Sequence, residues 1–152
     1  MGHSPDCGPA WPIGNTGQGE YIKALDWFQR ALNSYEQPLG KDHPSTLATA
    51  NNMAAVFDKQ GEYIKALEWY QHTLDAWRKT LGKDHPSTLI TVHNMGILYF
   101  KLEEHNMTRD WLQHALDGWV KTLGKDLPSA LDTFNNMAIL SCHQWKYKRA
   151  LD

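Results

Sequence analysis

Cysteine is scarce in this sequence. Only Cys7 and Cys142 occur among its 152 residues, and the two lie in segments of different character. Such a pair makes neither the disulfide framework of a small secreted domain nor the spacing of a metal site. The sequence therefore favours a reducing compartment and a cytoplasmic location.

Features that would direct the chain to a membrane or to nucleic acid are also missing. No apolar run approaches the roughly 18 residues of a membrane span, and the N-terminus lacks the charged and apolar segments of a signal sequence. The formal net charge of -2 leaves no basic surplus to attract nucleic acid or an anionic membrane. We therefore expect neither nucleic acid nor membranes among the partners.

The motifs of common enzymes are absent too. The sequence has no Gly-rich phosphate loop and no nucleophile elbow. Cys142 and His143 are neighbours in a predicted helix, so their side chains point in different directions and make a poor activated thiolate. The eight histidines form no tight pair on one helical face, which a zinc site would need. We expect a protein that is not an enzyme and that uses no metal or other cofactor.

What the sequence does contain is an internal repeat. The phrase GKDHPSTL stands at residues 40–47 and again at 82–89, and GKDLPSAL follows at 124–131, each copy 42 residues after the last. The same interval relates GEYIKALDWFQRAL at 19–32 to GEYIKALEWYQHTL at 61–74. Self-similarity at such a period indicates stacked structural repeats. We expect units at about 19–60, 61–102 and 103–144, and a partial unit at 145–152.

Each unit contains two helical patterns. The first covers about residues 45–60, with counterparts near 87–102 and 129–144. Its apolar residues recur at steps of three and four, which predicts one buried helical stripe: Leu47, Ala50, Met53, Ala54 and Phe57. The second covers about 63–81, with counterparts near 21–39 and 105–123. Its predicted stripe is Ala66, Trp69, Tyr70, Leu74, Trp77 and Leu81.

The repeated phrase is typical of a corner between two helices. Gly40 and Gly82 suit the left-handed backbone that ends a helix. The proline of the phrase suits the first turn of the next helix, after an Asp-His pair able to cap it. We expect Gly19 and Gly61 to close the other corner of the unit in the same way.

These residues resemble a known family. The unit is similar to the tetratricopeptide repeat of the long, 42-residue kind found in kinesin light chains and in fungal NACHT or NB-ARC receptor-type proteins. The likeness covers residues 19–152, and the family's small and aromatic signature positions are occupied by Ala54, Gly61, Tyr63, Ala66 and Tyr70. The resemblance implies an all-α solenoid of antiparallel helix pairs in a right-handed superhelix. We expect six full helices and a short helical stub.

The third unit departs from this pattern. Glu103 replaces the turn glycine, Thr108 replaces the signature alanine, and Arg109 stands where the second unit has Leu67. Leu127 replaces the histidine of the repeated phrase. We therefore expect the third unit to pack less regularly than the others.

The two ends of the chain do not complete the repeat. Residues 1–18 contain Pro5, Pro9 and Pro12 with several glycines, which prevent a regular helix. We interpret this segment as an irregular leader, either disordered or added in cloning. The last predicted helix stops after about two turns. The chain is then a fragment of a longer array, or its ends are covered by another molecule.

The resemblance also implies a binding surface, because in this family the first helix of each pair lines the concave face. We expect the partner-binding residues there to be Asn51, Ala55, Lys59, His93, Ile97, Phe100, Lys101, Asn135 and Ile139. Asn51, His93 and Asn135 would form a polar ladder, similar to the paired asparagines with which kinesin light chains contact cargo peptides. Asparagine both donates and accepts hydrogen bonds, which suits the backbone of an extended peptide.

Other side chains in these helices have structural interpretations. Asn52, Asn94 and Asn136 lie beside core methionines, and we expect them to bond to buried backbone groups between helices. The Lys-then-Asn pairing that clamps a C-terminal carboxylate in other tetratricopeptide proteins is missing, so chaperone-tail binding is not expected. The tryptophans in register are expected in the core: Trp27, Trp69, Trp111, Trp77 and Trp119.

Two functions are compatible with this pattern. The first is a scaffold, part of a larger protein, that binds an extended peptide or a protein partner on its concave face. The alternative is a self-association module that forms homo-oligomers through exposed repeat ends, since each unit of an array buries its neighbour's face.

Overall fold

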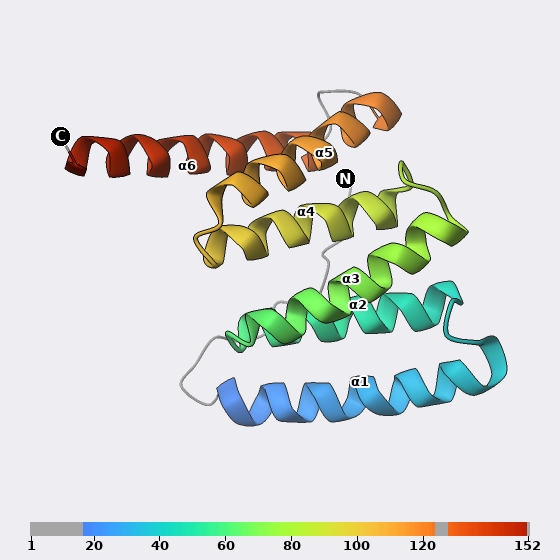
Figure 1. Cartoon of the computed structure of the whole chain (residues 1–152). Coiled ribbons are helices and arrows are strands. Elements are labelled where there is room, and N and C mark those ends of the chain that lie inside the picture. Colours follow the sequence, from blue (N-terminus) through green and yellow to red (C-terminus); the bar gives the residue numbers. More distant parts are fainter. Residues whose placement is uncertain (1–16, 124–127, 152) are drawn as a thin grey trace. The chain divides into compact units, whose positions relative to one another are not determined.

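The residues that the structure describes form six helices and no strand (Figure 1). The computed structural model describes residues 17–123 and 128–151, with side chains for all of these except 123 and 145–151. The helices are α1 (Gly17–Leu39), α2 (Pro44–Lys59), α3 (Tyr63–Thr80), α4 (Pro86–Lys101), α5 (His105–Leu123) and α6 (Pro128–Leu151). The predicted all-α fold is confirmed.

The six helices belong to two compact units, residues 1–80 and 81–152. In unit 1, α2 packs against both α1 and α3. In unit 2, α5 packs against both α4 and α6, and α4 also contacts α6. Successive helices within each unit run antiparallel (Figure 1). The handedness of a superhelix concerns the placement of one unit against the other and stays a prediction.

The predicted stripe of α2 is its buried face. Leu47 and Ala54 are 0 % exposed, and Ala50 and Met53 are nearly as well buried. Ala50 and Met53 form a cluster with Leu32 of α1, which the half-buried side chains of Leu25, Phe28, Phe57 and Trp69 cover. Burying a side chain of this size contributes roughly 1.5–3 kcal/mol. The apolar spacing read from the sequence therefore identifies the surface that joins the helices.

The stripe of α3 is confirmed except at Trp69, which is half-buried, and at its end. Ala66, Tyr70, Leu74 and Trp77 are buried. Leu81 is 37 % exposed, because α3 ends at Thr80 and the leucine lies beyond it. The stripe thus ends with the helix that carries it.

Buried threonines are a part of the core that the apolar pattern missed. The fully or nearly buried ones are Thr46, Thr49, Thr73, Thr88, Thr91, Thr108 and Thr133. Each hydroxyl has a backbone acceptor, as when Thr73 donates to the carbonyl of Trp69 at 2.8 Å. Bonding to the carbonyl four residues earlier satisfies a hydroxyl inside a helix. These threonines therefore pack like small apolar residues without leaving an unpaired polar atom, which would cost about 1–3 kcal/mol.

The repeated phrase forms a closed corner between helices. Gly40 takes a left-handed φ of 87°, and the His43 ring caps α2 by accepting from the Ser45 N–H at 3.2 Å. The Thr46 hydroxyl then donates back to the Gly40 carbonyl at 2.8 Å. The second copy repeats these features at Gly82, His85, Ser87 and Thr88. The phrase recurs because its glycine, histidine and threonine each take part in closing the corner.

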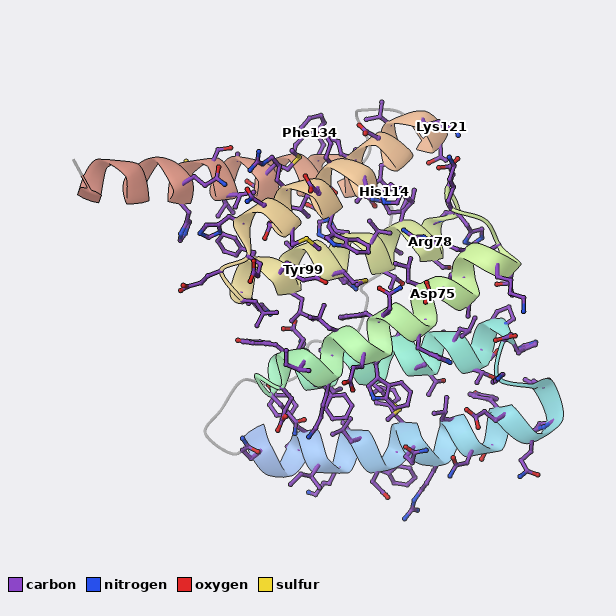
Figure 2. All side chains as sticks on the ribbon, in the orientation of Figure 1. Asp75, Arg78, Tyr99, His114, Lys121 and Phe134 are labelled. Carbon is purple, nitrogen blue, oxygen red and sulfur yellow. The ribbon has the colours of Figure 1, made fainter. Side chains whose placement is uncertain are left out.

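One ion pair attaches the second of these corners to α5. Lys121, near the end of α5, lies beside the loop before α4 (Figure 2) and donates to the Asp84 carboxylate there. This hydrogen bond lowers the pKa of Asp84, although partial desolvation opposes it. The two charges are held together at the surface of unit 2.

The other corner keeps its geometry in both units. Gly61 has a φ of 81°, and the Glu62 N–H donates to the Phe57 carbonyl at 2.9 Å across the end of α2. Glu103 takes the same left-handed backbone, with a φ of 61°. The Glu104 N–H correspondingly donates to a carbonyl in the last turn of α4 at 3.0 Å. A glutamate thus occupies a backbone conformation that normally favours glycine.

Three expectations about the ends of the repeats are corrected. Gly19 lies inside α1 and makes no turn, because no helix described precedes α1. Gly17 and Gln18 form the first turn of α1, while the rest of the expected leader lies outside the described residues. The separate helical stub is also wrong: Trp145 stands at the repeat position of Gly61, and the chain continues as α6 to Leu151. A tryptophan resists the left-handed turn that glycine permits.

The other departures of the third unit are accommodated in place. Thr108 is 0 % exposed and donates its hydroxyl to the Glu104 carbonyl at 3.0 Å. Arg109 is exposed and donates to Asn106 at 2.7 Å. Neither substitution interrupts the packing of α5 against α4. Leu127 lies outside the described residues.

The tryptophans divide into three environments. Trp77 and Trp119 are buried, as predicted. Trp111 is half-buried and stacks on Tyr99 of α4, with ring centroids 6.1 Å apart, and Trp69 is half-buried in unit 1. For Trp27 the prediction is wrong, because its side chain is 67 % exposed and has only the Arg30 guanidinium over its ring, at 5.3 Å. No helix described packs on that side of α1.

Candidate partner-binding surface

In unit 1 the expected binding residues form one stripe on α2. Asn51, Ala55 and Lys59 are spaced four apart, which places them on one side of the helix. Asn51 and Ala55 are half-buried, and Lys59 is exposed. The core residues of α2 occupy a different side, so this stripe runs along the edge of the packed surface.

In unit 2 the expected residues come from two contacting helices. On α4, Ile97 and Phe100 are half-buried and Lys101 is exposed. On α6, Asn135 is exposed and Ile139 is 42 % exposed. Because α4 and α6 contact each other, we expect apolar and polar side chains from both helices to belong to one surface.

An aromatic cluster closes one end of this surface. The ring of Phe100 meets the ring of His143 from α6 edge to face, with centroids 5.1 Å apart. It also lies 6.2 Å from the ring of His105, at the start of α5. Nδ1 of His105 is buried and has no hydrogen-bond partner in the residues described. Phe100 therefore joins three helices of unit 2.

His93 is bound by α6 at both of its ring nitrogens. Nδ1 lies 3.0 Å from the Thr133 hydroxyl, and Nε2 lies 3.3 Å from the amide nitrogen of Asn136. Since the amide nitrogen can only donate, Nε2 accepts and Nδ1 carries the proton. Nδ1 then donates to Thr133, whose hydroxyl donates to the Ser129 carbonyl at 2.8 Å. These three hydrogen bonds can form together only when the imidazole is neutral, because a protonated Nε2 could not accept from Asn136.

The environment of His93 favours that neutral form. Burial lowers the pKa of His93 below its ordinary value, and the charge of Asp132 opposes this effect without cancelling it. Desolvation disfavours the charged imidazolium, and the nearby carboxylate favours it. The same burial that holds His93 between α4 and α6 thus stabilises the tautomer that the hydrogen bonds need.

The residues of the predicted polar ladder have different roles in the structure. Both ring nitrogens of His93 bond to residues of α6, so His93 links α4 to α6. Asn136, expected to bond to buried backbone, bonds instead to the His93 side chain, whereas Asn52 and Asn94 are half-buried. The alignment of Asn51 with His93 concerns the placement of the two units and stays a prediction. The one sequence feature that could have indicated these contacts is the spacing of Thr133 and Asn136, which lie three residues apart and so on one face of a helix.

Two further properties bear on the kind of site. Within residues 17–123 and 128–151, no three histidine, cysteine or acidic side chains gather closely enough to hold a metal ion. Among the helices described, none has the length and apolar character needed to cross a bilayer.

The repeat can be compared with known families. The family model described as tetratricopeptide repeat matches three overlapping stretches, residues 15–75, 48–107 and 88–152. The chain belongs to the tetratricopeptide repeat family. The resemblance read from the sequence is therefore confirmed, and the helix pairs described above are tetratricopeptide units.

Solved tetratricopeptide structures share this fold. One is a crystal structure of nearly identical TPR-like repeats from Podosopora anserina, in a protein provisionally assigned as a kinesin light chain. It is 23 % identical, with a TM-score of 0.74, and the match covers 89 % of this chain. Another is BtubC (BKLC) from P. vanneervenii, 18 % identical with a TM-score of 0.75 over 87 % of this chain. At these identities the likeness concerns the fold.

The chain spans 64 % of the Podosopora anserina chain and 53 % of BtubC. No curated protein matches the sequence at a significant level.

Proposed function

We propose that this chain is an interaction scaffold that binds an extended peptide segment of a partner protein. Tetratricopeptide repeats are in general protein-interaction scaffolds. The binding surface in unit 2 is the face shared by α4 and α6, and the α2 stripe of Asn51, Ala55 and Lys59 is its counterpart in unit 1.

The observation that carries this proposal is the mixture of exposed groups on α4 and α6. Ile139 is 42 % exposed although it is apolar, and it lies on the same helix as the exposed amide of Asn135. Ile97 and Phe100, half-buried on α4, extend the apolar area. An extended peptide offers apolar side chains and backbone amides in alternation, so it can use both kinds of group at once.

The charge beside the stripe indicates which kind of peptide would bind. Lys59, at the end of the α2 stripe, is exposed, so this stripe ends beside a cation. Cations at the edge of an interface attract acidic partners and fix their orientation more than they add affinity. A peptide that combines apolar and acidic residues is therefore the preferred ligand.

The test begins with a phage-displayed library of random peptides, selected on the full chain. Binding of a selected peptide is then measured by fluorescence anisotropy for the wild type and for the double variant Asn135→Ala, Ile139→Asp. We expect the variant to bind about tenfold more weakly or worse, since a peptide group left unpaired costs about 1–3 kcal/mol. Its melting temperature should stay near that of the wild type, because both side chains are exposed.

Val120→Asp is the matched control. Val120 of α5 is 41 % exposed, almost the same as Ile139, but it lies on a helix outside the proposed surface. The proposal fails if Val120→Asp weakens binding as much as the double variant does. It also fails if the selected peptides bind equally well when Asn135 and Ile139 are changed.

A further inference from the structure

One helix contact is built from matched pairs of a leucine and a small residue. Leu47 of α2 packs in a cluster with Ala76 and Trp77 of α3. In unit 2, Leu89 of α4 lies so close to Gly118 of α5 that an added Cβ would come within 2.3 Å of its Cδ2 atom. Both leucines are 0 % exposed. In each unit a leucine fits against a position that must stay small.

α6 carries the leucine half of this contact without its partner. Leu131 stands 42 residues after Leu89, at the same repeat position, yet its side chain is 52 % exposed. Ala138 stands at the position of Gly96, which is buried against Leu112, and it too is exposed. No helix of the described chain packs on this face of α6.

α1 carries the complementary half. Ser34, exposed and small, stands at the repeat position of Ala76 and Gly118. The next residue, Tyr35, is 39 % exposed, whereas Trp77 at the same position is 4 % exposed. Within unit 1, side chains of α1 also extend away from α2 (Figure 2).

We propose that a second copy of this chain covers these faces. The Leu131 face of α6 in one copy docks on the Ser34 face of α1 in another, and this reproduces between molecules the contact that α2 makes with α3. The repeat identifies the occupant, because the chain already shows which helix face fits each surface. This association uses other residues than the proposed peptide binding, although Leu131 and Asn135 lie one turn apart on α6, so the two surfaces adjoin.

The contact joins two different surfaces, so it is head-to-tail. Each copy that uses its Leu131 face keeps its Ser34 face available for another copy, which makes the assembly grow with concentration. The docked helix would also lie over the side of α1 that holds the exposed Trp27. Hydrophobic burial at both faces is the driving force.

Sedimentation equilibrium over a concentration series tests the proposal on the full chain. At about 100 µM, a contact with a micromolar dissociation constant leaves most of the protein associated, so the average mass of the wild type should rise. Leu131→Asp and Ser34→Arg should each be monomeric. Ile64→Asp on α3, where the isoleucine is 63 % exposed, should associate like the wild type. Circular dichroism melts check that all variants are folded.

The decisive measurement mixes the two monomeric variants. Leu131→Asp retains a working Ser34 face, and Ser34→Arg retains a working Leu131 face, so an equal mixture should form a dimer of one of each and grow no further. A wild type that stays monomeric overturns the proposal. So does a mixture that does not associate, because two like faces would then have made the contact.

Discussion

Gly61 and Glu103 occupy the same corner in the two units. Comparing them distinguishes what determines the backbone conformation of the corner from the free energy that this conformation costs. Both take a left-handed backbone, with φ values of 81° and 61°, and the following N–H closes the helix end in both. The hydrogen bonds and the packing of the next helix therefore determine the corner. The residue that stands there changes only how much free energy the corner requires. The two units agree in their packed side chains. They differ in the residue at this corner, Gly61 or Glu103, and in the residue at position 93, where unit 1 has Asn51.

The largest expected effect concerns a position at which the units agree. Leu89→Ala should lower the free energy of unfolding by about 2–5 kcal/mol, because it leaves a cavity beside Gly118 in a fully buried contact. Leu131→Ala removes the same side chain from the same repeat position where it is half exposed, and should change stability by less than about 0.5 kcal/mol. Urea denaturation of the two variants measures both values. Equal losses would mean that the repeat position, and not burial, sets the energy.

The next effect distinguishes His93 from Asn51, its counterpart in unit 1. The pKa of His93 is lowered in the folded protein, whereas in the unfolded chain it is about 6.5. As the pH falls below about 6.5 the unfolded chain takes up the proton first, so the free energy of unfolding decreases, and above that pH the loss disappears. Each unit of pKa depression corresponds to about 1.4 kcal/mol.

His93→Asn copies Asn51 into unit 2 and should remove this part of the pH dependence. Denaturation of the wild type and the variant at about pH 7.5 and about pH 5.5 gives the comparison. Carboxylates elsewhere in the chain contribute equally to both proteins. If both lose the same stability on acidification, the hydrogen bonds to Thr133 and Asn136 do not depend on a neutral ring.

A reciprocal exchange tests the corner itself. Glu103→Gly should raise the free energy of unfolding by about 1 kcal/mol, because glycine adopts a positive φ without steric strain. Gly61→Glu should lower it by a similar amount in unit 1. Thermal melts of both variants provide the measurement. A glutamate that costs nothing at either corner would show that the closing hydrogen bonds alone decide the conformation.

The smallest expected effect concerns the ion pair between Lys121 and Asp84. Lys121→Gln should return the pKa of Asp84 toward its ordinary value, because it removes the hydrogen bond that lowers it most. The melting temperature should hardly change, since the Lys121 side chain is 65 % exposed and solvent screens such pairs. An NMR titration of the Asp84 carboxyl is the measurement, and added salt should reduce the difference.

The packed faces were predictable because they depend on local periodicity. Leu47, Ala50, Met53 and Ala54 lie on one side of any regular helix with this sequence, so their burial in α2 follows from spacing. The Gly40 corner was predictable for a related reason, since glycine, proline and a capping side chain each have strong local preferences.

The candidate site was less predictable because its contacts join residues far apart in the chain. His93 bonds to Thr133 and Asn136, 40 and 43 residues away, and a repeat alignment pairs it instead with Asn135. Shifting the partner by one residue moves it about 100° around a helix, which separates a residue between helices from one facing solvent. Trp27 shows the same limit, because its spacing equals that of Trp69 and only the absence of a covering helix exposes it.

The corner at Gly40 has a consequence for how such a protein changes in evolution. Its cap and its returning hydrogen bond involve only atoms between Gly40 and Thr46, so a duplicated stretch of gene would bring a complete junction with it. A unit inserted or deleted at this point leaves no interrupted bond to repair. The number of units can therefore drift more freely than the sequence of any one of them.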